Sequence, residues 1–243
     1  MKKALFLAAL GASALTASAI TITSGQYIGQ GVPADGQSLA GDRFRSFQPT
    51  GADENYLGVP SLGTAANRVA QQLNWMNPDN SLQSFDFTFQ YDQANDRLAS
   101  TILGSTIYWN SWSSSLVSIG KTKGAADLNA FQITVKQGDI GSVVYLTDMV
   151  LDGTALGSFY GVDGLNKDWL ATGSDMNLTD GFTLTGKLWL QGAFSSSQEN
   201  SAVNLTAGWD SRGFAPSVPD GGATLALLSG ALMGLSALRR KLA

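Results

Sequence analysis

The chain has 243 residues, of which 44% are hydrophobic and only 14% are charged, and its formal net charge is −4. It contains neither histidine nor cysteine, which excludes Ser-His-Asp and Cys-His catalysis, histidine- or thiolate-bound metals and disulfides. Residues 20–219 carry ten basic and eighteen acidic side chains. This acidic balance argues against nucleic acid as a partner, and the length is ample for one domain.

The first residues are typical of a secretory signal peptide. Two lysines precede an apolar run over residues 4–15, and Ala17-Ser18-Ala19 has the small-x-small pattern of a cleavage site. We therefore expect residues 1–19 to be a signal peptide. Ala17 and Ala19 would mark its cleavage site. A retained N-terminal anchor is disfavoured because the apolar run is short.

Little strand periodicity is visible before residue 80. Residues 28–60 are rich in glycine and alternate weakly, so we predict irregular structure there. A short helix is expected next, capped by Thr64 and ended by Asn77-Pro78. Its apolar stripe would consist of Ala65, Ala66, Val69, Leu73 and Trp75.

From residue 85 onward, apolar and polar residues alternate with the period of two that half-buried strands require. The clearest strand is residues 85–92, followed by a turn at residues 93–96 and a return strand over residues 98–109, bent at Gly104. Further strands are predicted at residues 131–136, 143–151, 182–190 and 203–209, with a turn at Asp152-Gly153.

Short alternating strands with glycine-rich turns predict a mainly β fold. We expect residues 20–210 to form one antiparallel β-sandwich or jelly-roll-like domain with one short helix. Residues 211–217 would be a linker to the C-terminal segment.

Aromatic residues form the first candidate site. Trp109 and Trp112 lie close together beside Tyr108, and Trp189 falls on the polar face of its predicted strand with Lys187. Aromatic faces stack on sugar rings, whereas the alternative for such residues is core packing. We hypothesise that Trp109, Trp112 and Trp189 contact glycan.

Carboxylates offer two weaker candidates. Asp92, Asn95 and Asp96 could supply oxygen ligands to calcium from one turn, but their spacing matches no EF-hand, and an ordinary Asx turn is the alternative. Glycosidase chemistry needs two carboxylates about 5–10 Å apart, and the two glutamates, Glu54 and Glu199, fall in predicted loops. We therefore expect neither an enzyme nor a cofactor.

The C-terminal segment combines a turn, an apolar helix and a basic cluster. Val218-Pro219-Asp220-Gly221-Gly222 disfavours helix and predicts an extended, exposed element. Residues 223–238 are apolar on all sides, as in a helix surrounded by lipid. As a helix, residues 221–238 would extend about 27 Å across a bilayer core of about 30 Å. Arg239-Arg240-Lys241 would stay cytoplasmic, with the domain on the periplasmic side.

This arrangement resembles the tails of exosortase substrates, the PEP-CTERM class of bacterial proteins. Within that class it is similar to the Val-Pro-Asp-Ser-Gly variant, with Gly221 in the place of serine. The resemblance covers residues 218–243 and, loosely, the signal peptide. It implies an exosortase as partner, cleavage near the motif, transfer to the envelope surface or the extracellular space, and association with exopolysaccharide and biofilm.

Together these features predict an exported, non-enzymatic envelope or extracellular-matrix protein with a structural or adhesive role. Before processing it would be held in the membrane by residues 223–238. The alternatives are a carbohydrate-binding module that contacts exopolysaccharide and, less favoured, a secreted glycan hydrolase.

Overall fold

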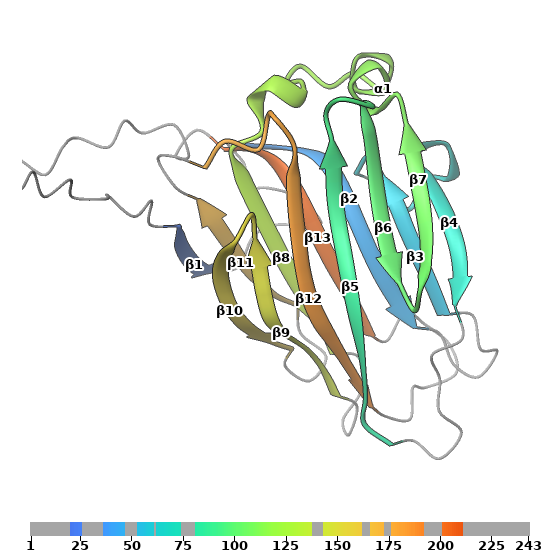
Figure 1. Cartoon of the computed structure of the whole chain (residues 1–243), viewed down its shortest axis with the longest axis vertical. Coiled ribbons are helices and arrows are strands. Elements are labelled where there is room, and N and C mark those ends of the chain that lie inside the picture. The colour runs from blue at the N-terminus through green and yellow to red at the C-terminus, as the bar shows by residue number, and fades with distance from the viewer. Residues whose placement is uncertain are drawn as a thin grey trace, which may run out of the picture.

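Two antiparallel β-sheets face each other across a shared hydrophobic core (Figure 1). The mainly β, antiparallel architecture predicted from the sequence is therefore confirmed. The computed structural model describes residues 20–25, 36–46, 53–60, 62–73, 81–137, 143–161, 166–172, 176–191 and 201–210.

Sheet A has seven strands in the order β1-β11-β8-β13-β2-β3-β4, and sheet B has six in the order β10-β9-β12-β5-β6-β7. The strands of sheet A are β1 (Thr21–Gly25), β2 (Gly36–Ser46), β3 (Asp53–Gly58), β4 (Arg68–Leu73), β8 (Ala130–Lys136), β11 (Asn166–Thr172) and β13 (Ser201–Asp210). Those of sheet B are β5 (Gln83–Asp92), β6 (Arg97–Ile102), β7 (Ser105–Asn110), β9 (Val143–Leu151), β10 (Thr154–Tyr160) and β12 (Phe182–Gln191). The helical elements are η1 (Ala65–Asn67), α1 (Trp112–Ser118) and η2 (Ala125–Asp127).

Five of these strands were located correctly by the sequence predictions, namely β5, β8, β9, β12 and β13. β5 and β12 pair in unbroken antiparallel register over nine residue pairs. The inward faces of both strands are apolar. Gly186 lies on the inward face of β12, where the side chains of Met149 and Phe87 pack closely against its backbone. A Cβ atom there would come within 2.3 Å of Met149 Sδ, so the position has no room for a side chain.

The prediction of irregular structure over residues 28–60 is wrong, because β2 and β3 lie within it. Both faces of β2 are covered, and its buried residues include polar as well as apolar side chains. Leu39, Asp42, Arg43 and Phe44 are all buried, whichever way they point. Because the carboxylate Asp42 occupies an inward position, the period of two disappears from the sequence of β2.

The helix predicted from Thr64 is also wrong. Only the 3₁₀ turn η1 forms, Thr64 makes no side-chain capping hydrogen bond, and the chain then continues as β4, paired with β3. A close contact fixes this connection, because the Val59 N–H donates to the Asn67 carbonyl at 2.8 Å. Strand pairing thus overrides the helical spacing of the apolar residues. The expected end of the helix at residues 75–78 lies outside the described residues.

The predicted return strand over residues 98–109 is in fact a hairpin of β6 and β7. Leu103 and Gly104 have φ values of 55° and 72°, which is the paired positive φ of a type I′ hairpin turn. Gly104 therefore reverses the chain instead of bending a strand. The observed helix, α1, follows β7. The sequence also gave no signal for β1, β10 and β11.

Several predictions fall outside the described residues. These are the signal peptide with Ala17 and Ala19, the polar turn at residues 195–200, the linker, and the whole C-terminal segment from Val218 to Lys241. No helix in the described ranges has both the length and the hydropathy needed to cross a bilayer.

Aromatic rings join the two sheets at the centre of the sandwich. Phe89 on β5 is fully buried, and its ring centroid lies 5.0 Å from that of Phe182 and 6.0 Å from that of Phe131 on β8. Phe131 and Phe182 also meet edge to face at 5.8 Å. These three rings connect β5 and β12 of sheet B with β8 of sheet A.

Replacing Phe89 with alanine should lower the free energy of unfolding by about 3–5 kcal/mol, because the substitution leaves a cavity between the two sheets. Chemical denaturation measures the loss. Val117→Ala is the control, since Val117 is 79% exposed and its truncation should change stability by no more than about 0.5 kcal/mol. Equal effects of the two substitutions would contradict the placement of Phe89 in the core.

Candidate functional site

Three aromatic rings form a continuous stack on the outer face of sheet B. Tyr160 on β10 pairs directly with Tyr145 on β9, and Tyr145 pairs directly with Trp189 on β12. The ring centroids of the two tyrosines are 5.3 Å apart with an interplanar angle of 30°, and those of Tyr145 and Trp189 are 5.5 Å apart at 13°. We call these three residues the aromatic ladder.

Strand alternation directs the ladder outward. Phe159, Leu146 and Leu188 are the chain neighbours of the three rings, and all three are buried in the core. Since successive side chains of a strand point to opposite faces, their neighbours must project from the outer face of the sheet.

Exposure changes along the ladder. Tyr145 and Trp189 are half-buried, whereas Tyr160 on the edge strand β10 is 54% exposed. The Trp189 Nε1–H donates to Thr147 Oγ1 at 3.0 Å, which fixes the orientation of the indole. Stacked aromatic pairs contribute about 0.5–1.5 kcal/mol of stabilisation beyond the burial of their area. This stacking holds the rings in place, so the ladder is a preformed surface.

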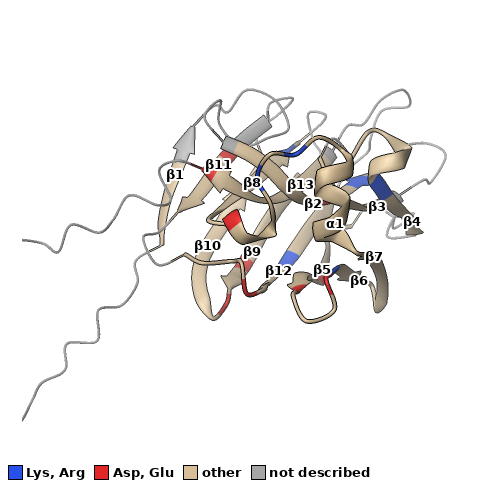
Figure 2. Cartoon of the chain, turned by 90° about the horizontal axis from the view of Figure 1, so that it is seen from above, with Lys and Arg blue, Asp and Glu red and all other residues tan. Residues whose placement is uncertain are grey.

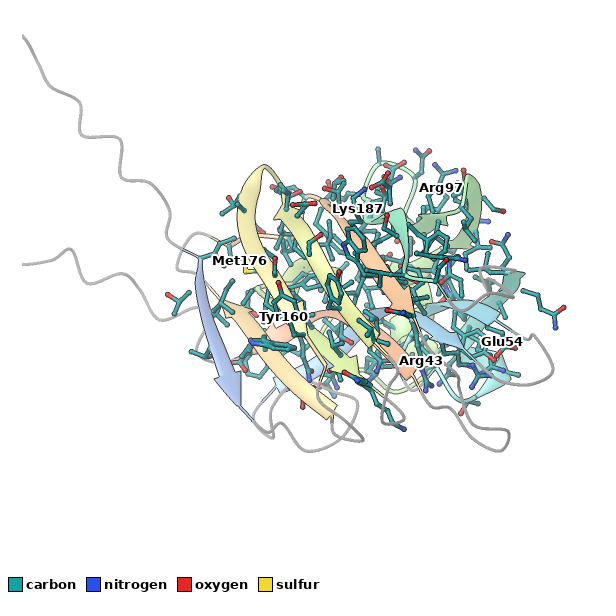
Figure 3. All side chains as sticks on the ribbon, turned by 90° about the horizontal axis from the view of Figure 1, so that it is seen from below. Arg43, Glu54, Arg97, Tyr160, Met176 and Lys187 are labelled. Atoms are coloured by element: carbon teal, nitrogen blue, oxygen red, sulfur yellow. The ribbon has the colours of Figure 1, made fainter. Side chains whose placement is uncertain are left out.

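Charged groups lie beside the ladder. Lys187 Nζ donates to Asp86 Oδ1 at 2.8 Å across β12 and β5. This hydrogen bond, together with the charges of Asp86 and Asp148, raises the pKa of Lys187. Figure 2 shows acidic segments along the sheet B side of the molecule and a basic segment on β12. In Figure 3, Lys187 and Arg97 lie on one side of the molecule, and Arg43 and Glu54 lie on the other.

The structure separates the three tryptophans that were predicted to contact glycan. Trp189 lies on the outer face of sheet B. Trp112 is fully buried, donates from Nε1 to the Leu39 carbonyl at 3.0 Å, and packs edge to face on Tyr91 at 4.6 Å. Trp109 is half-buried, packs against the core and donates to Ser115 Oγ at 3.3 Å. Core packing, the alternative considered for aromatic residues, therefore describes Trp109 and Trp112.

Sequence reasoning missed the two tyrosines of the ladder. Tyr145 occupies an outward position of a strand that was predicted, so the alternation could have drawn attention to it. Tyr160 lies in β10, which was not predicted. Its pairing with Tyr145 follows from a hairpin register with two irregularities, between Ala155 and Phe159, which the sequence does not reveal.

Asp92, Asn95 and Asp96 form a hydrogen-bonded turn. Asp92 Oδ2 accepts from Asn95 Nδ2 at 2.6 Å, and this bond lowers the pKa of Asp92. Asp96 accepts from the N–H and the hydroxyl of Ser113 at 2.8 and 2.7 Å, at the start of α1. The geometry fits the Asx-turn alternative. Across the described ranges, no three His, Cys, Asp or Glu residues gather closely enough to hold a metal ion.

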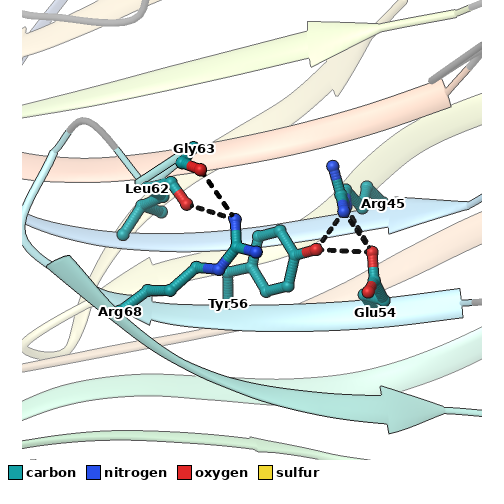
Figure 4. A network of polar contacts seen from close by, with 6 residues as sticks. All are labelled: Arg45, Glu54, Tyr56, Leu62, Gly63 and Arg68. Carbon is teal, nitrogen blue, oxygen red and sulfur yellow. Dashed lines mark hydrogen bonds and ion pairs between the residues drawn. The ribbon is translucent and has the colours of Figure 1, made fainter. Parts of the chain in front are cut away.

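Glu54, once considered as a possible catalytic carboxylate, lies on β3 in a network on sheet A (Figure 4). Its Oε2 accepts from Arg45 Nε and from the Tyr56 hydroxyl, both at 2.6 Å. The Arg68 guanidinium lies 3.8 Å from the Tyr56 ring centroid and donates to the Leu62 carbonyl at 2.7 Å. These contacts tie β2, β3 and β4 together, so the role that they support for Glu54 is structural. Glu199 lies outside the described residues.

A buried carboxylate links the two sheets. Asp42 on β2 is fully buried, and its Oδ2 accepts from Ser100 Oγ of β6 at 2.7 Å. Ser100 Oγ in turn accepts from Asn55 Nδ2 at 2.9 Å. Within the described residues, Asp42 Oδ1 and Asn55 Oδ1 have no hydrogen-bond partner. Burial raises the pKa of Asp42 well above its usual range, because desolvation disfavours the charged form.

This raised pKa makes stability depend on pH. The folded state binds the Asp42 proton more tightly than the unfolded state, whose pKa is about 3.9. The stabilisation from the protonated group is therefore complete below pH about 4 and is lost as the pH rises through the folded pKa.

Asp42→Asn keeps the size of the side chain and cannot ionise. We expect its free energy of unfolding to fall less than that of the wild type when denaturation is repeated at increasing pH from 4. Asp180→Asn, at an exposed position, serves as the control and should keep the wild-type dependence. A wild-type slope in Asp42→Asn would show that Asp42 is not the group responsible.

Comparison with known proteins identifies the C-terminal segment. Residues 217–242 match the family model described as the VPDSG-CTERM motif, which confirms the resemblance of the tail to the Val-Pro-Asp-Ser-Gly variant. The motif marks the chain as an exported protein that is targeted to an exosortase and associated with the cell envelope. A comparison with curated proteins found no match.

Proposed function

We propose that this protein is a non-enzymatic component of the bacterial envelope or extracellular matrix with a structural or adhesive role. The VPDSG-CTERM motif at residues 217–242 is the observation that carries the proposal. It sends a β-sandwich to the cell surface, where the domain becomes the working part of the protein. The acidic charge of residues 20–219 helps such a domain to stay soluble.

The tail would act as a temporary anchor. Residues 223–238 would span the membrane and Arg239-Arg240-Lys241 would remain cytoplasmic, while the sandwich lies on the periplasmic side. The exosortase would then cleave near Asp220 and release or transfer the domain. The cleavage chemistry belongs to the exosortase, and this chain is its substrate.

Glu54 and Asp42 give little support to the alternative of a glycan hydrolase. Glu54 is engaged by Arg45 and Tyr56, and Asp42 is fully buried between the sheets. Neither fits an acid and a base placed on either side of a scissile bond. Release of reducing ends from a panel of glycans would contradict a non-enzymatic role.

The second candidate, binding of exopolysaccharide, has a specific observation in its favour. The aromatic ladder presents stacked rings on rigid strands, with Tyr160 more than half exposed. Binding of this kind would supply the adhesion that the envelope location calls for.

Deletion of residues 223–243 should remove the anchor and leave the protein soluble in the periplasm, as measured by cell fractionation. In cells that contain the exosortase, mass spectrometry of the intact chain should show a mature protein that ends near Asp220. An internal deletion of residues 195–200, which leaves the tail unchanged, is the matched control and should fractionate as the wild type does. Membrane association that persists after the tail deletion would contradict the anchor.

A further inference from the structure

We propose that the aromatic ladder is the centre of a binding strip for an uncharged polysaccharide that lies across β10, β9 and β12. The inference rests on the proposed function, because the sorting tail brings the domain to the place where such polymers occur. Binding itself depends only on the outer face of sheet B, so it can be tested apart from sorting.

The chemistry of the strip matches a sugar chain. A pyranose ring has apolar C–H faces and a rim of hydroxyl groups, so it stacks on aromatic rings while its hydroxyls bond to polar neighbours. The ladder supplies the rings of Tyr160, Tyr145 and Trp189. Tyrosine and tryptophan suit this role because each combines a large apolar surface with a polar group.

The polar neighbours are in place on the same face. Thr147 follows Tyr145 by one outward position along β9 and already orients Trp189. Ser158 is exposed on β10, and Ser84 pairs directly with Trp189 from β5. Hydroxyl groups thus border the ladder on three strands.

The strip is preformed. Unbroken pairing of Trp189 with both Tyr145 and Ser84 fixes the backbone, and the Thr147 hydrogen bond holds the indole. A surface that is already ordered loses little side-chain entropy when a ligand binds. The most exposed ring, Tyr160, lies on the edge strand of the sheet.

The charges favour an uncharged polymer. Lys187 is the basic residue beside the ladder, and it is engaged by Asp86 with Asp148 close enough to act on it. Two carboxylates therefore surround one ammonium group, on a body whose residues 20–219 carry a formal charge of −8. An anionic polysaccharide would be repelled, whereas carboxylates accept hydrogen bonds from neutral sugar hydroxyls.

The narrowness of the apolar surface disfavours a protein partner. On one side of the ladder the next outward residues, Lys187 and Thr147, are polar cross-strand partners, and on the other side Gln191 pairs with Val143, so the ladder is narrow along each strand. A stable protein interface buries about 800 Å² on each side, with an apolar centre. A row of three rings bordered by hydroxyl and charged groups suits an extended polymer better.

Affinity electrophoresis of the full-length protein in mild non-ionic detergent tests the proposal, with gels that contain hydroxyethyl cellulose, dextran or alginate. We expect retardation by at least one of the two neutral polymers and none by alginate. Tyr160→Ser should weaken the retardation about tenfold, the loss expected when one stacking contact disappears. Tyr160→Phe keeps the ring and should bind within about twofold of the wild type.

Tyr108→Ser is the matched control. Tyr108 is 46% exposed on the same face of sheet B, but it lies on the opposite edge strand, β7, and contacts Arg97 instead of the ladder. The Tyr108→Ser substitution should therefore leave polysaccharide binding unchanged. Trp189→Ala should abolish binding, and its thermal unfolding shows whether the fold is retained. If that variant does not fold, Tyr160→Ser decides the question, because its side chain lies at the surface.

The charge argument has its own test. Replacing Asp86 and Asp148 together with asparagine leaves Lys187 without its acidic partners, so alginate should now retard the protein. Failure of the double variant to gain this binding would overturn the charge selectivity. Absence of retardation by both neutral polymers, or equal losses in Tyr160→Ser and Tyr108→Ser, would overturn the binding strip. These results would leave the proposed sorting function intact, because that function is tested separately by cell fractionation of the tail deletion.

Discussion

The register of β9 with its two neighbours determines both the core and the outer surface of sheet B. Leu146 faces inward between Phe159 and Leu188, so Tyr145 must face outward between Tyr160 and Trp189. A slip of one residue would expose the apolar set and bury the ladder. The energy of core packing therefore holds the ladder in place, and the candidate site needs no binding partner to become ordered.

The two sheets use their outer faces differently, which explains what the sequence could reveal. Strands of sheet B are half-buried, so alternation located β5, β9 and β12. In sheet A, polar residues on the outer face are themselves buried, and Gln132, Thr134 and Arg43 are no more than 6% exposed. β8 could still be predicted because its inward residues are strongly apolar. β2 could not, since a carboxylate, Asp42, occupies an inward position and removes the pattern.

For the candidate site, the pattern within a single strand predicts which way a side chain points, but it does not predict its cross-strand partners. The outward position of Trp189 follows from the alternation of β12 alone, and it was predicted. The partners of Trp189 come from β9 and β10, whose register depends on irregularities around Gly157 that no local rule supplies. Trp112 shows the opposite case. It is close to Trp109 in sequence, but the start of α1 turns it into the core, where it contacts Leu39 of β2.

A rigid sandwich with a shallow strip fits the way in which a sorted protein would adhere. Three rings offer few contacts, so one domain would hold a polymer weakly. If the proposed exosortase sorting holds several copies at the same surface, a long polymer would meet more than one of them at once. Binding at linked sites then strengthens overall attachment by orders of magnitude without any new contact. Weak individual strips would let the polymer rearrange locally while the array keeps it attached, which combines the roles of the tail and the ladder in one physical scheme.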